Sequence, residues 1–287
     1  MKEICVLSGK GGTGKTSLSA AFATLGEQVA VADCDVDAAN LYLVLQPENE
    51  REEQFITGYK AVIHDNDCTA CGLCIDYCRF GAISFSGSKV MISETSCDGC
   101  KLCFRICPAE AIEMIPNDKS RWYAGRFRKG VMVHARLAPG EENSGKLVHA
   151  VREKVREMAQ KEGFETIIID GPPGTGCPVI SSVTGTDKVI VVTEPTRSGL
   201  HDLKRIVELV ENFRIHPSVV INKYDLNEDM SNQIAKWCAE MNIVVAGQIP
   251  FDRLVVDAML HCKSIVEWAP GSTVSQEIRK IWDLINS

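Results

Sequence analysis

The fold is decided by residues 9–16, Gly-Lys-Gly-Gly-Thr-Gly-Lys-Thr. They fit the pattern G-x-x-x-x-G-K-S/T, and the apolar residues 4–7 before them predict a buried strand that leads into the loop, with a helix after it. In such a loop, backbone N–H groups cradle phosphate oxygens, the lysine meets the terminal phosphates and the hydroxyl holds magnesium. We therefore expect Thr16 to bind magnesium, Lys15 to be catalytic, and the nucleotide to contact Gly11, Gly12, Thr13, Gly14, Lys15, Thr16 and Ser17.

Apolar stretches recur along the whole chain and predict strands. They alternate with amphipathic stretches such as residues 200–213 and 233–241, which predict helices. This alternation is typical of an α/β fold with a doubly wound, mostly parallel sheet, which binds its ligand at the carboxyl ends of the strands. The strands are expected at 4–8, 29–33, 131–135, 166–170, 188–193, 218–222 and 243–248.

Aspartates stand at the ends of two of these strands. Asp33 and Asp35 follow the second apolar stretch, and Asp170 ends the run Ile167–Ile169. A carboxylate after a buried strand is the Walker B arrangement, so Asp170 is expected to hold the magnesium shell, through water. Plain strand-end caps are the alternative role for all three aspartates.

A further lysine in the loop, Lys10, narrows the class of proteins that the loop resembles. With Lys10, the sequence K-G-G-T-G-K-T resembles the deviant Walker A loop of the MinD/ParA/Mrp family, and the resemblance covers nearly the whole chain. It implies an ATPase whose Lys10 is catalytic because it reaches the partner's phosphates across a nucleotide-sandwich homodimer. It also implies that Asp35 orients or deprotonates the attacking water and that residues 171–176 form a second switch. A solvated loop cation is the alternative for Lys10.

Two residues are expected to contact the base. Asn222 begins an N-K-x-D sequence whose Asp225 could accept hydrogen bonds from guanine. The family resemblance implies adenine instead, with Asn222 recognising the base and Pro250 packing on it. ATP is therefore preferred over GTP.

The 13 cysteines include two runs with the same spacing, C-x2-C-x2-C-x3-C. Matching apolar residues surround both runs and indicate an internal duplication. In this arrangement three thiolates of a run bind one cubane cluster and the fourth binds the other cluster. We expect the first cluster on Cys68, Cys71, Cys74 and Cys107, and the second on Cys97, Cys100, Cys103 and Cys78.

The cysteine runs resemble a bacterial two-cluster 4Fe-4S ferredoxin over about residues 60–116. The resemblance implies an inserted ferredoxin-like α+β domain at 59–116 within a P-loop ATPase domain of residues 1–58 and 117–287, with the clusters near the nucleotide face. Structural zinc and disulfides are alternatives that the spacing disfavours. Residues 48–53 are expected to be an acidic linker into the insertion. The basic, aromatic residues 119–129 after it are expected to be a solvated junction whose aromatic side chains pack on the insertion, and docking of a partner or an acidic protein is the alternative.

Two further cysteines, Cys34 and Cys177, flank the predicted switches. A thiol beside a helix N-terminus and lysines has a depressed pKa, so both are expected to react with alkylating agents in a nucleotide-dependent way. A small apolar filler is the alternative for Cys177.

Composition excludes some classes of protein. With 31 basic and 38 acidic residues the net charge is -7, which weighs against nucleic-acid binding. No apolar run approaches the roughly 18 residues of a membrane span, so we expect no stable membrane insertion, and residues 275–285 are expected to form a packing helix. The absence of an export signal predicts a cytoplasmic location.

The expected function is slow, dimer-dependent ATP hydrolysis coupled to two 4Fe-4S clusters, with ATP and Mg²⁺ as the other cofactors. The clusters would serve electron transfer or cluster handling with an unidentified redox or cluster-acceptor protein. Two alternatives stay open. One is a nucleotide-timed positioning or binding protein like MinD or ParA whose clusters sense redox state, and the other is an iron-sulfur cluster carrier like Mrp. Complete ligation by four cysteines favours redox clusters over a labile cargo.

Overall fold

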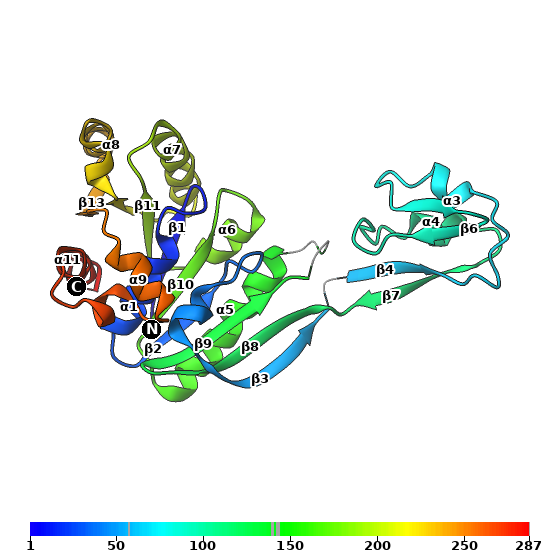
Figure 1. Ribbon diagram of the computed structural model, residues 1–287, viewed down its shortest axis with the longest axis horizontal. Coiled ribbons are helices and arrows are strands. Elements are labelled where there is room, and N and C mark those ends of the chain that lie inside the picture. The colour runs from blue at the N-terminus through cyan, green and yellow to red at the C-terminus, as the bar shows by residue number, and fades with distance from the viewer. Residues whose placement is uncertain (57, 139–140, 142–143, 287) are drawn as a thin grey trace.

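The computed structural model describes residues 1–56, 58–138, 141 and 144–286 (Figure 1). All seven predicted strands are present, each within a few residues of its expected bounds. Two strands that the sequence did not predict are β3 (Glu48–Phe55) and β8 (Ser120–Phe127). The predicted strands are β1 (Lys2–Ser8), β2 (Val29–Asp33), β9 (Gly130–Arg136), β10 (Thr166–Pro173), β11 (Lys188–Thr193), β12 (Ser218–Asn222) and β13 (Val244–Ile249).

In the described part of the chain these strands form one nine-stranded sheet in the order β13-β12-β11-β1-β10-β2-β9-β8-β3. The strands from β13 to β9 are parallel to their neighbours. β8 and β3 continue the sheet in antiparallel orientation. The predicted α/β fold with a large, mostly parallel sheet is therefore confirmed.

Helices cover both faces of the sheet. The side chains of β1 show why: Cys5 and Leu7 pack in the core of one face, and Ile4 and Val6 pack in the core of the other. Burial on both faces explains the continuous apolar runs in the sequence. The helices of the first face are α5 (Ser144–Glu162), α6 (Cys177–Val183), α7 (Arg197–Glu211) and α8 (Glu228–Glu240). Those of the second are α1 (Lys15–Leu25), α2 (Leu41–Leu45), α9 (Leu254–Leu260), α10 (Ile265–Trp268) and α11 (Thr273–Asn286).

The segments on either side of the predicted insertion are paired strands and not linkers. β3 is exposed, as expected of a solvated segment, but the prediction that the aromatic side chains of residues 119–129 pack on the insertion is wrong. The acidic strand β3 pairs with the basic strand β8, and Arg126 lies 3.2 Å from Glu50 across the pair. Trp122 and Phe127 are buried in the two cores of the large sheet and not against the insertion. Charge of opposite sign on two neighbouring strands stabilises their pairing, and this cross-strand complementarity is invisible when each segment is considered alone.

Residues 58–117 form a small part of their own with a third hydrophobic cluster, which includes Ala61, Ile83 and Ile112. β4 pairs with β7 and β5 pairs with β6, both antiparallel. The elements are β4 (Gly58–Ile63), α3 (Leu73–Asp76), β5 (Ile83–Ser86), β6 (Lys89–Ile92), α4 (Leu102–Ile106) and β7 (Ile112–Asn117). The division of the chain into domains at 58/59 and 116/117 stays a prediction.

Figure 1 shows this small part at the end of an arm of paired strands, away from β1 and α1. The cysteine runs therefore do not lie near the nucleotide face of their own chain, and that expectation is wrong. At the other end of the molecule, α11 packs its apolar side on α1 and β13, as predicted for residues 275–285. Within the described ranges, none of the helices combines the length and the apolar character needed to cross a bilayer.

A buried histidine lies between two tyrosine rings beside α2. The ring of His134 stacks on those of Tyr42 and Tyr123, with centroids 5.0 Å away on each side. Only 3% of His134 is exposed, and its Nδ1 has no hydrogen-bond partner among the described residues. Burial, reinforced by the charge of Arg136, lowers the pKa of His134 to about 4. The folded chain therefore keeps this ring neutral at pH values where the unfolded chain protonates it.

We expect His134 to make the fold sensitive to acid. Between its unfolded pKa near 6.5 and its folded pKa near 4, the unfolded state binds the proton more tightly, so stability falls as the pH falls. His134→Phe keeps the stacked ring and should remove about 2 kcal/mol of the stability lost between about pH 7 and about pH 5. Urea unfolding of both proteins at the two pH values measures this difference. An identical loss of stability in the variant would contradict the assignment.

Candidate functional site

The loop between β1 and α1 depends on two glycines with left-handed backbone. Gly12 has φ 82°, and Gly14, which caps the N-terminus of α1, has φ 92°. A Cβ on Gly14 would lie 2.3 Å from Nδ2 of Asn222, so a side chain there would be both strained and blocked. Within the loop, the buried Oγ1 of Thr13 has no hydrogen-bond partner among the described residues. The loop thus keeps a buried polar atom available for a ligand.

Lys15 begins α1 and is only 5% exposed. Its Nζ lies 2.9 Å from Oδ1 of Asp170 and 3.7 Å from Oδ2 of Asp35. Burial by itself would lower the pKa of Lys15, but the carboxylates of Asp170, Asp35 and Asp33 offset burial and raise it. Lys15 is therefore a fixed cation at the end of the loop, suited to phosphate oxygens.

Three aspartates lie around this lysine and leave an excess of negative charge. Burial, with repulsion from Asp170, raises the pKa of Asp33 to about 8. Burial also raises the pKa of Asp35, although Lys15 opposes the shift. Such a surplus of carboxylates is relieved by a divalent cation, whose preferred ligands are oxygens. Asp33 additionally accepts hydrogen bonds from the backbone N–H groups of Asp35 and Leu41, which fits the cap alternative for this residue.

The structure brings the two residues predicted to bind magnesium together. Thr16 Oγ1 donates to Oδ2 of Asp170 at 2.9 Å. Ser19, on the next turn of α1, donates from Oγ to Oδ1 of the same carboxylate at 2.7 Å. No motif in the sequence marks Ser19, because only the folded sheet places α1 beside the end of β10. Asp170 is thus held in one orientation by two hydroxyl groups.

Lys10 is bound by a carboxylate of its own chain. Its Nζ lies 2.6 Å from Oε1 of Glu194 and 3.4 Å from Oγ of Ser198. Glu194, which follows β11, also lies 3.4 Å from Nζ of Lys223. Burial would raise the pKa of Glu194, but Lys10 and Lys223 lower it, so the carboxylate stays ionised. Glu194 could not be predicted from the sequence because no motif surrounds it.

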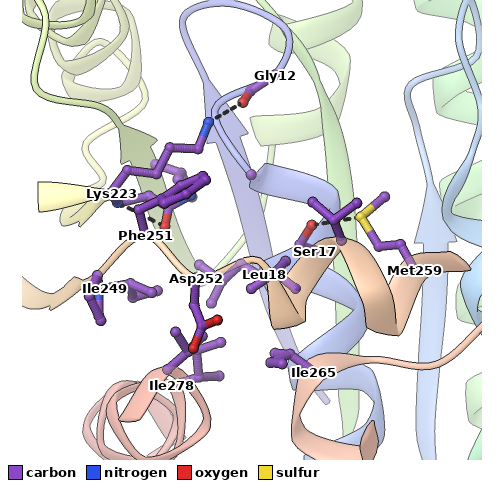
Figure 2. A pocket seen from close by; sticks show the side chains of 17 residues that line it. Gly12, Ser17, Leu18, Lys223, Ile249, Phe251, Asp252, Met259, Ile265 and Ile278 are labelled. Carbon is purple, nitrogen blue, oxygen red and sulfur yellow. Dashed lines mark hydrogen bonds between the residues drawn. The ribbon is translucent and has the colours of Figure 1, made fainter. Parts of the chain in front are cut away.

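A cavity opens beside the loop and is mostly apolar (Figure 2). It holds about 760 Å³ when its open mouth is included, which is the size of a small-molecule site. Five residues predicted to bind the nucleotide line it, namely Gly12, Gly14, Ser17, Asn222 and Pro250. Figure 2 also shows Phe251, Lys223 and Met259 around it, with Lys223 Nζ donating to the Gly12 carbonyl and Ser17 Oγ donating to Met259 Sδ. These three residues were not predicted, because the turn after β13 and α9 reach the loop only through tertiary packing.

The two candidate base-reading groups are engaged differently. Asn222 Nδ2 donates to the Thr13 carbonyl at 2.7 Å, so the amide ties β12 to the loop at the edge of the cavity. Asp225 accepts a hydrogen bond from the backbone N–H of Phe251 at 2.7 Å. The carboxylate of the N-K-x-D sequence therefore holds a turn of the chain, which weighs against its use for guanine.

The eight predicted cluster cysteines line two hollows in the small part. The first hollow is lined by Cys68, Cys71, Cys74 and Cys107. The second hollow is lined by Cys78, Cys97, Cys100 and Cys103, and also by Cys74, which lines both hollows. Burial, and then the charges of neighbouring thiolates, raise the pKa of Cys103 to about 11. No group of three or more His, Cys, Asp or Glu side chains in the described ranges is arranged to hold a metal ion.

The prediction that Cys34 is a reactive thiol is wrong. Cys34 is fully buried in the core beneath α5, and burial raises its pKa well above the ordinary value. The sequence suggested a switch cysteine because Cys34 stands between two aspartates, but its side chain points into the core side of the strand end. Cys177 is exposed at the start of α6, so its nucleotide-dependent reactivity stays a prediction.

Comparisons with known proteins match this chain to nucleotide-binding proteins, in agreement with the glycine-rich loop, Lys15 and the aspartates around it. Residues 4–265 match the family described as CobQ/CobB/MinD/ParA nucleotide binding domain. An uncharacterized protein of Methanocaldococcus jannaschii, MJ0578, is 33% identical over 98% of this chain and 95% of its own length. The septum site-determining protein MinD of Bacillus subtilis is 28% identical over 92% of this chain and 81% of its own. The structure of MinD complexed with Mg-ADP from Pyrococcus horikoshii superposes with a TM-score of 0.60 at 19% identity, covering 100% of this chain and 96% of that one, which shows the shared fold.

Proposed function

The chain belongs to the CobQ/CobB/MinD/ParA family of nucleotide-binding proteins, and on that premise we propose that it is an ATPase that hydrolyses MgATP slowly as a homodimer and carries two 4Fe-4S clusters. The observation that carries the ATPase proposal is the position of Lys15, buried at the start of α1 between Asp170 and Asp35. The Pyrococcus horikoshii protein with the same fold is described with Mg-ADP bound. A magnesium-bound nucleotide such as Mg-ADP suits this site, because Lys15 can contact phosphate oxygens and the aspartates can hold magnesium.

Each loop residue has a role that follows from its place. The loop amides and Lys15 bind the β- and γ-phosphates, while Thr16 and Asp170 hold the magnesium shell. Magnesium neutralises charge on the phosphates, and the surplus of carboxylates described above fits such a cation. Asp35 stands on the other side of Lys15, and its raised pKa makes it a better acceptor for the proton of an attacking water. ATP is preferred over GTP because Asp225 is engaged by Phe251.

Asp35→Asn tests the hydrolytic part of this proposal. The variant keeps the shape of the side chain but loses the proton acceptor, so we expect ATP to bind and hydrolysis to fall at least about 100-fold. Phosphate release measures the rate, and size-exclusion chromatography in MgATP should show the ATP-bound dimer accumulating. Asp37→Asn, at an exposed position of the same loop, is the matched control and should hydrolyse at the parental rate. Parental turnover in Asp35→Asn would assign the proton to another group.

Glu194→Gln should strengthen the dimer. Lys10 must leave Glu194 before it can reach a partner's phosphates, and removing the carboxylate charge removes that competition. A partly exposed ion pair contributes up to about 1 kcal/mol, and two such pairs break in each symmetric dimer, so the dimer dissociation constant in MgATP should fall about four- to 25-fold. Analytical ultracentrifugation measures it, with Glu208→Gln, exposed on α7, as the control. A weaker dimer in Glu194→Gln would mean that Glu194 supports Lys10 and does not restrain it.

The iron-sulfur part of the proposal is supported by the two hollows. The lining of each hollow includes three cysteines of one run and the fourth cysteine of the other run, which is the crossed ligand set of a two-cluster protein, and Cys74 lines the second hollow as well as the first. A cubane binds each thiolate through a different iron, so its four ligands lie farther apart than the ligands of one metal ion. Clusters bound here would supply one-electron redox chemistry. The eight cysteines and their spacing along the chain therefore fit two 4Fe-4S clusters.

A second candidate is a nucleotide-timed positioning protein, which the likeness to the Bacillus subtilis MinD favours. Anaerobic reconstitution followed by electron paramagnetic resonance with and without MgATP separates it from the first. A cluster signal or potential that changes with MgATP supports coupled electron transfer. Clusters that ignore MgATP, in a protein that still dimerises, support the second candidate. Transfer of iron and sulfur to an apo-acceptor would instead support a cluster carrier like Mrp.

A further inference from the structure

The carboxylate of Asp170 is shared by three side chains of α1. Its Oδ2 accepts a hydrogen bond from Thr16 Oγ1 at 2.9 Å, and its Oδ1 lies 2.9 Å from Lys15 Nζ and 2.7 Å from Ser19 Oγ. Asp170 and Ser19 are both fully buried, so bulk water cannot replace a donor that leaves. Oδ1 therefore has two donors in the described part of the chain, one charged and one neutral.

Lys15 and Thr16 have a second task when a nucleotide binds. In the proposed function Lys15 contacts phosphate oxygens, and the Thr16 hydroxyl belongs to the magnesium shell. Lys15 Nζ lies between Asp170 and Asp35 when no ligand is present, so a move toward the phosphates weakens its contact with Oδ1 of Asp170. The charged donor of Oδ1 is thus the one that the ligand competes for.

The Ser19 hydroxyl has one hydrogen and two acceptors within reach. Its Oγ lies 3.1 Å from the carbonyl oxygen of Lys15, one turn earlier on α1, and 2.7 Å from Oδ1 of Asp170. A hydrogen bond to a carboxylate is shorter and roughly twice as strong as one to a neutral carbonyl, so the hydrogen points to Asp170. Ser19 is not among the described residues that line the cavity beside the loop, and a nucleotide in that cavity would leave its hydrogen bond in place.

We propose that Ser19 is a positioning residue that keeps Oδ1 of Asp170 hydrogen-bonded when Lys15 moves from Asp170 to the phosphates. This inference rests on the proposed function, because it concerns the site where the phosphates would bind. A buried carboxylate oxygen that loses its donor raises the free energy of the state in which it lies. In the empty protein Lys15 supplies a donor, whereas in the nucleotide-bound protein Ser19 supplies it. Ser19 therefore favours nucleotide binding without touching the nucleotide.

Ser19→Ala tests this proposal with the loss of a single oxygen atom from a helix position. The affinity for ATP, measured by calorimetry, should fall about tenfold both in EDTA and in MgCl2, because Lys15 leaves Asp170 in either case. Urea unfolding without nucleotide should stay close to that of the parent, since Lys15 still contacts Oδ1 in the empty site. Parental affinity for ATP in Ser19→Ala would overturn the proposal.

Thr24 provides the matched control, because it is another buried hydroxyl of α1. Its Oγ1 donates to the carbonyl of Ala20 and lies 2.6 Å from Oγ of Ser264, away from the loop that binds the nucleotide. Thr24→Val keeps the shape of the side chain and should bind ATP with parental affinity, whatever it does to stability. An equal loss of affinity in Thr24→Val would mean that any buried change in α1 weakens binding, and would overturn the role of Ser19.

A double-mutant cycle with Asp170→Asn, measured in EDTA, shows whether Ser19 acts through the carboxylate. Asp170→Asn removes the charge that holds Lys15, so this variant should bind ATP in EDTA at least as tightly as the parent. In its background Ser19→Ala should change the affinity about twofold or less, because a neutral amide needs the donor less. The same tenfold loss in both backgrounds would assign Ser19 to its bond with the Lys15 carbonyl and overturn the proposal. Failure of the proposed function looks different, because the parental chain would then bind no ATP in EDTA or in MgCl2.

Discussion

Lys15→Ala will abolish nucleotide binding. Lys15 is the buried cation of a site that also holds Asp33, Asp35 and Asp170, so removing it leaves carboxylates where the phosphates must lie. Losing a buried charge partner costs several kcal/mol, and we expect the affinity for MgATP to fall at least about 100-fold. Equilibrium dialysis or calorimetry with MgATP measures the loss. Lys161→Ala, exposed on α5, is the control for a lost lysine elsewhere.

Lys10→Ala should behave differently from Lys15→Ala. Lys10 contacts Glu194 and Ser198 and is more than one-third exposed, so a single chain can bind MgATP without it. We expect near-parental affinity for MgATP together with loss of dimerisation and of hydrolysis. Parental hydrolysis and dimerisation by Lys10→Ala would show that the lysine is a solvated loop cation.

Cys78→Ser and Cys107→Ser should each damage the cluster of the other run. Cys78 belongs to the first run but lines the second hollow, and Cys107 belongs to the second run but lines the first hollow. Since each fourth ligand crosses over, Cys78→Ser should alter the signal of the second cluster and Cys107→Ser that of the first. Iron should fall from about eight per chain toward about seven or about four. Iron analysis and electron paramagnetic resonance of the anaerobically reconstituted proteins measure both effects.

Cys262→Ser is the control for this experiment because Cys262 lies outside both hollows. It should keep the parental iron content and both signals. Two intact 4Fe-4S signals in both Cys78→Ser and Cys107→Ser would require other ligands and would end the ferredoxin-like assignment. Damage to the cluster of the same run would overturn the crossing alone.

The sequence was sufficient to predict the parallel sheet and the glycine-rich loop between β1 and α1. Runs such as Ile167–Ile169 are apolar because helices cover both faces, and that signal is local. The pairing of Thr16 with Asp170 was also predictable, since both stand at the carboxyl edge of a parallel sheet. Local patterns therefore predict elements that are stabilised by their own burial.

Features that depend on contact between two segments far apart in the chain could not be predicted from the sequence. β3 is almost entirely exposed and highly charged, and only its pairing with β8 makes it a strand. Glu194 and Ser19 are ordinary polar residues until the sheet places them beside Lys10 and Asp170. The burial of Cys34 likewise depends on α5, which lies far along the chain. Each of these features is produced by a tertiary contact, and a tertiary contact leaves no periodic pattern in the local sequence.

The arm of paired strands that carries residues 58–117 extends from the large sheet, so a rotation at the sheet would move its far end. β8 and β3 extend directly from the sheet edge next to β9, and β9 itself pairs with β2, the strand that ends at Asp33. A small rotation of these strands between nucleotide states would be magnified into a large sweep at the far end, where the cysteines lie (Figure 1). ATP would then control where the cysteine-rich tip points, and with which neighbour it makes contact.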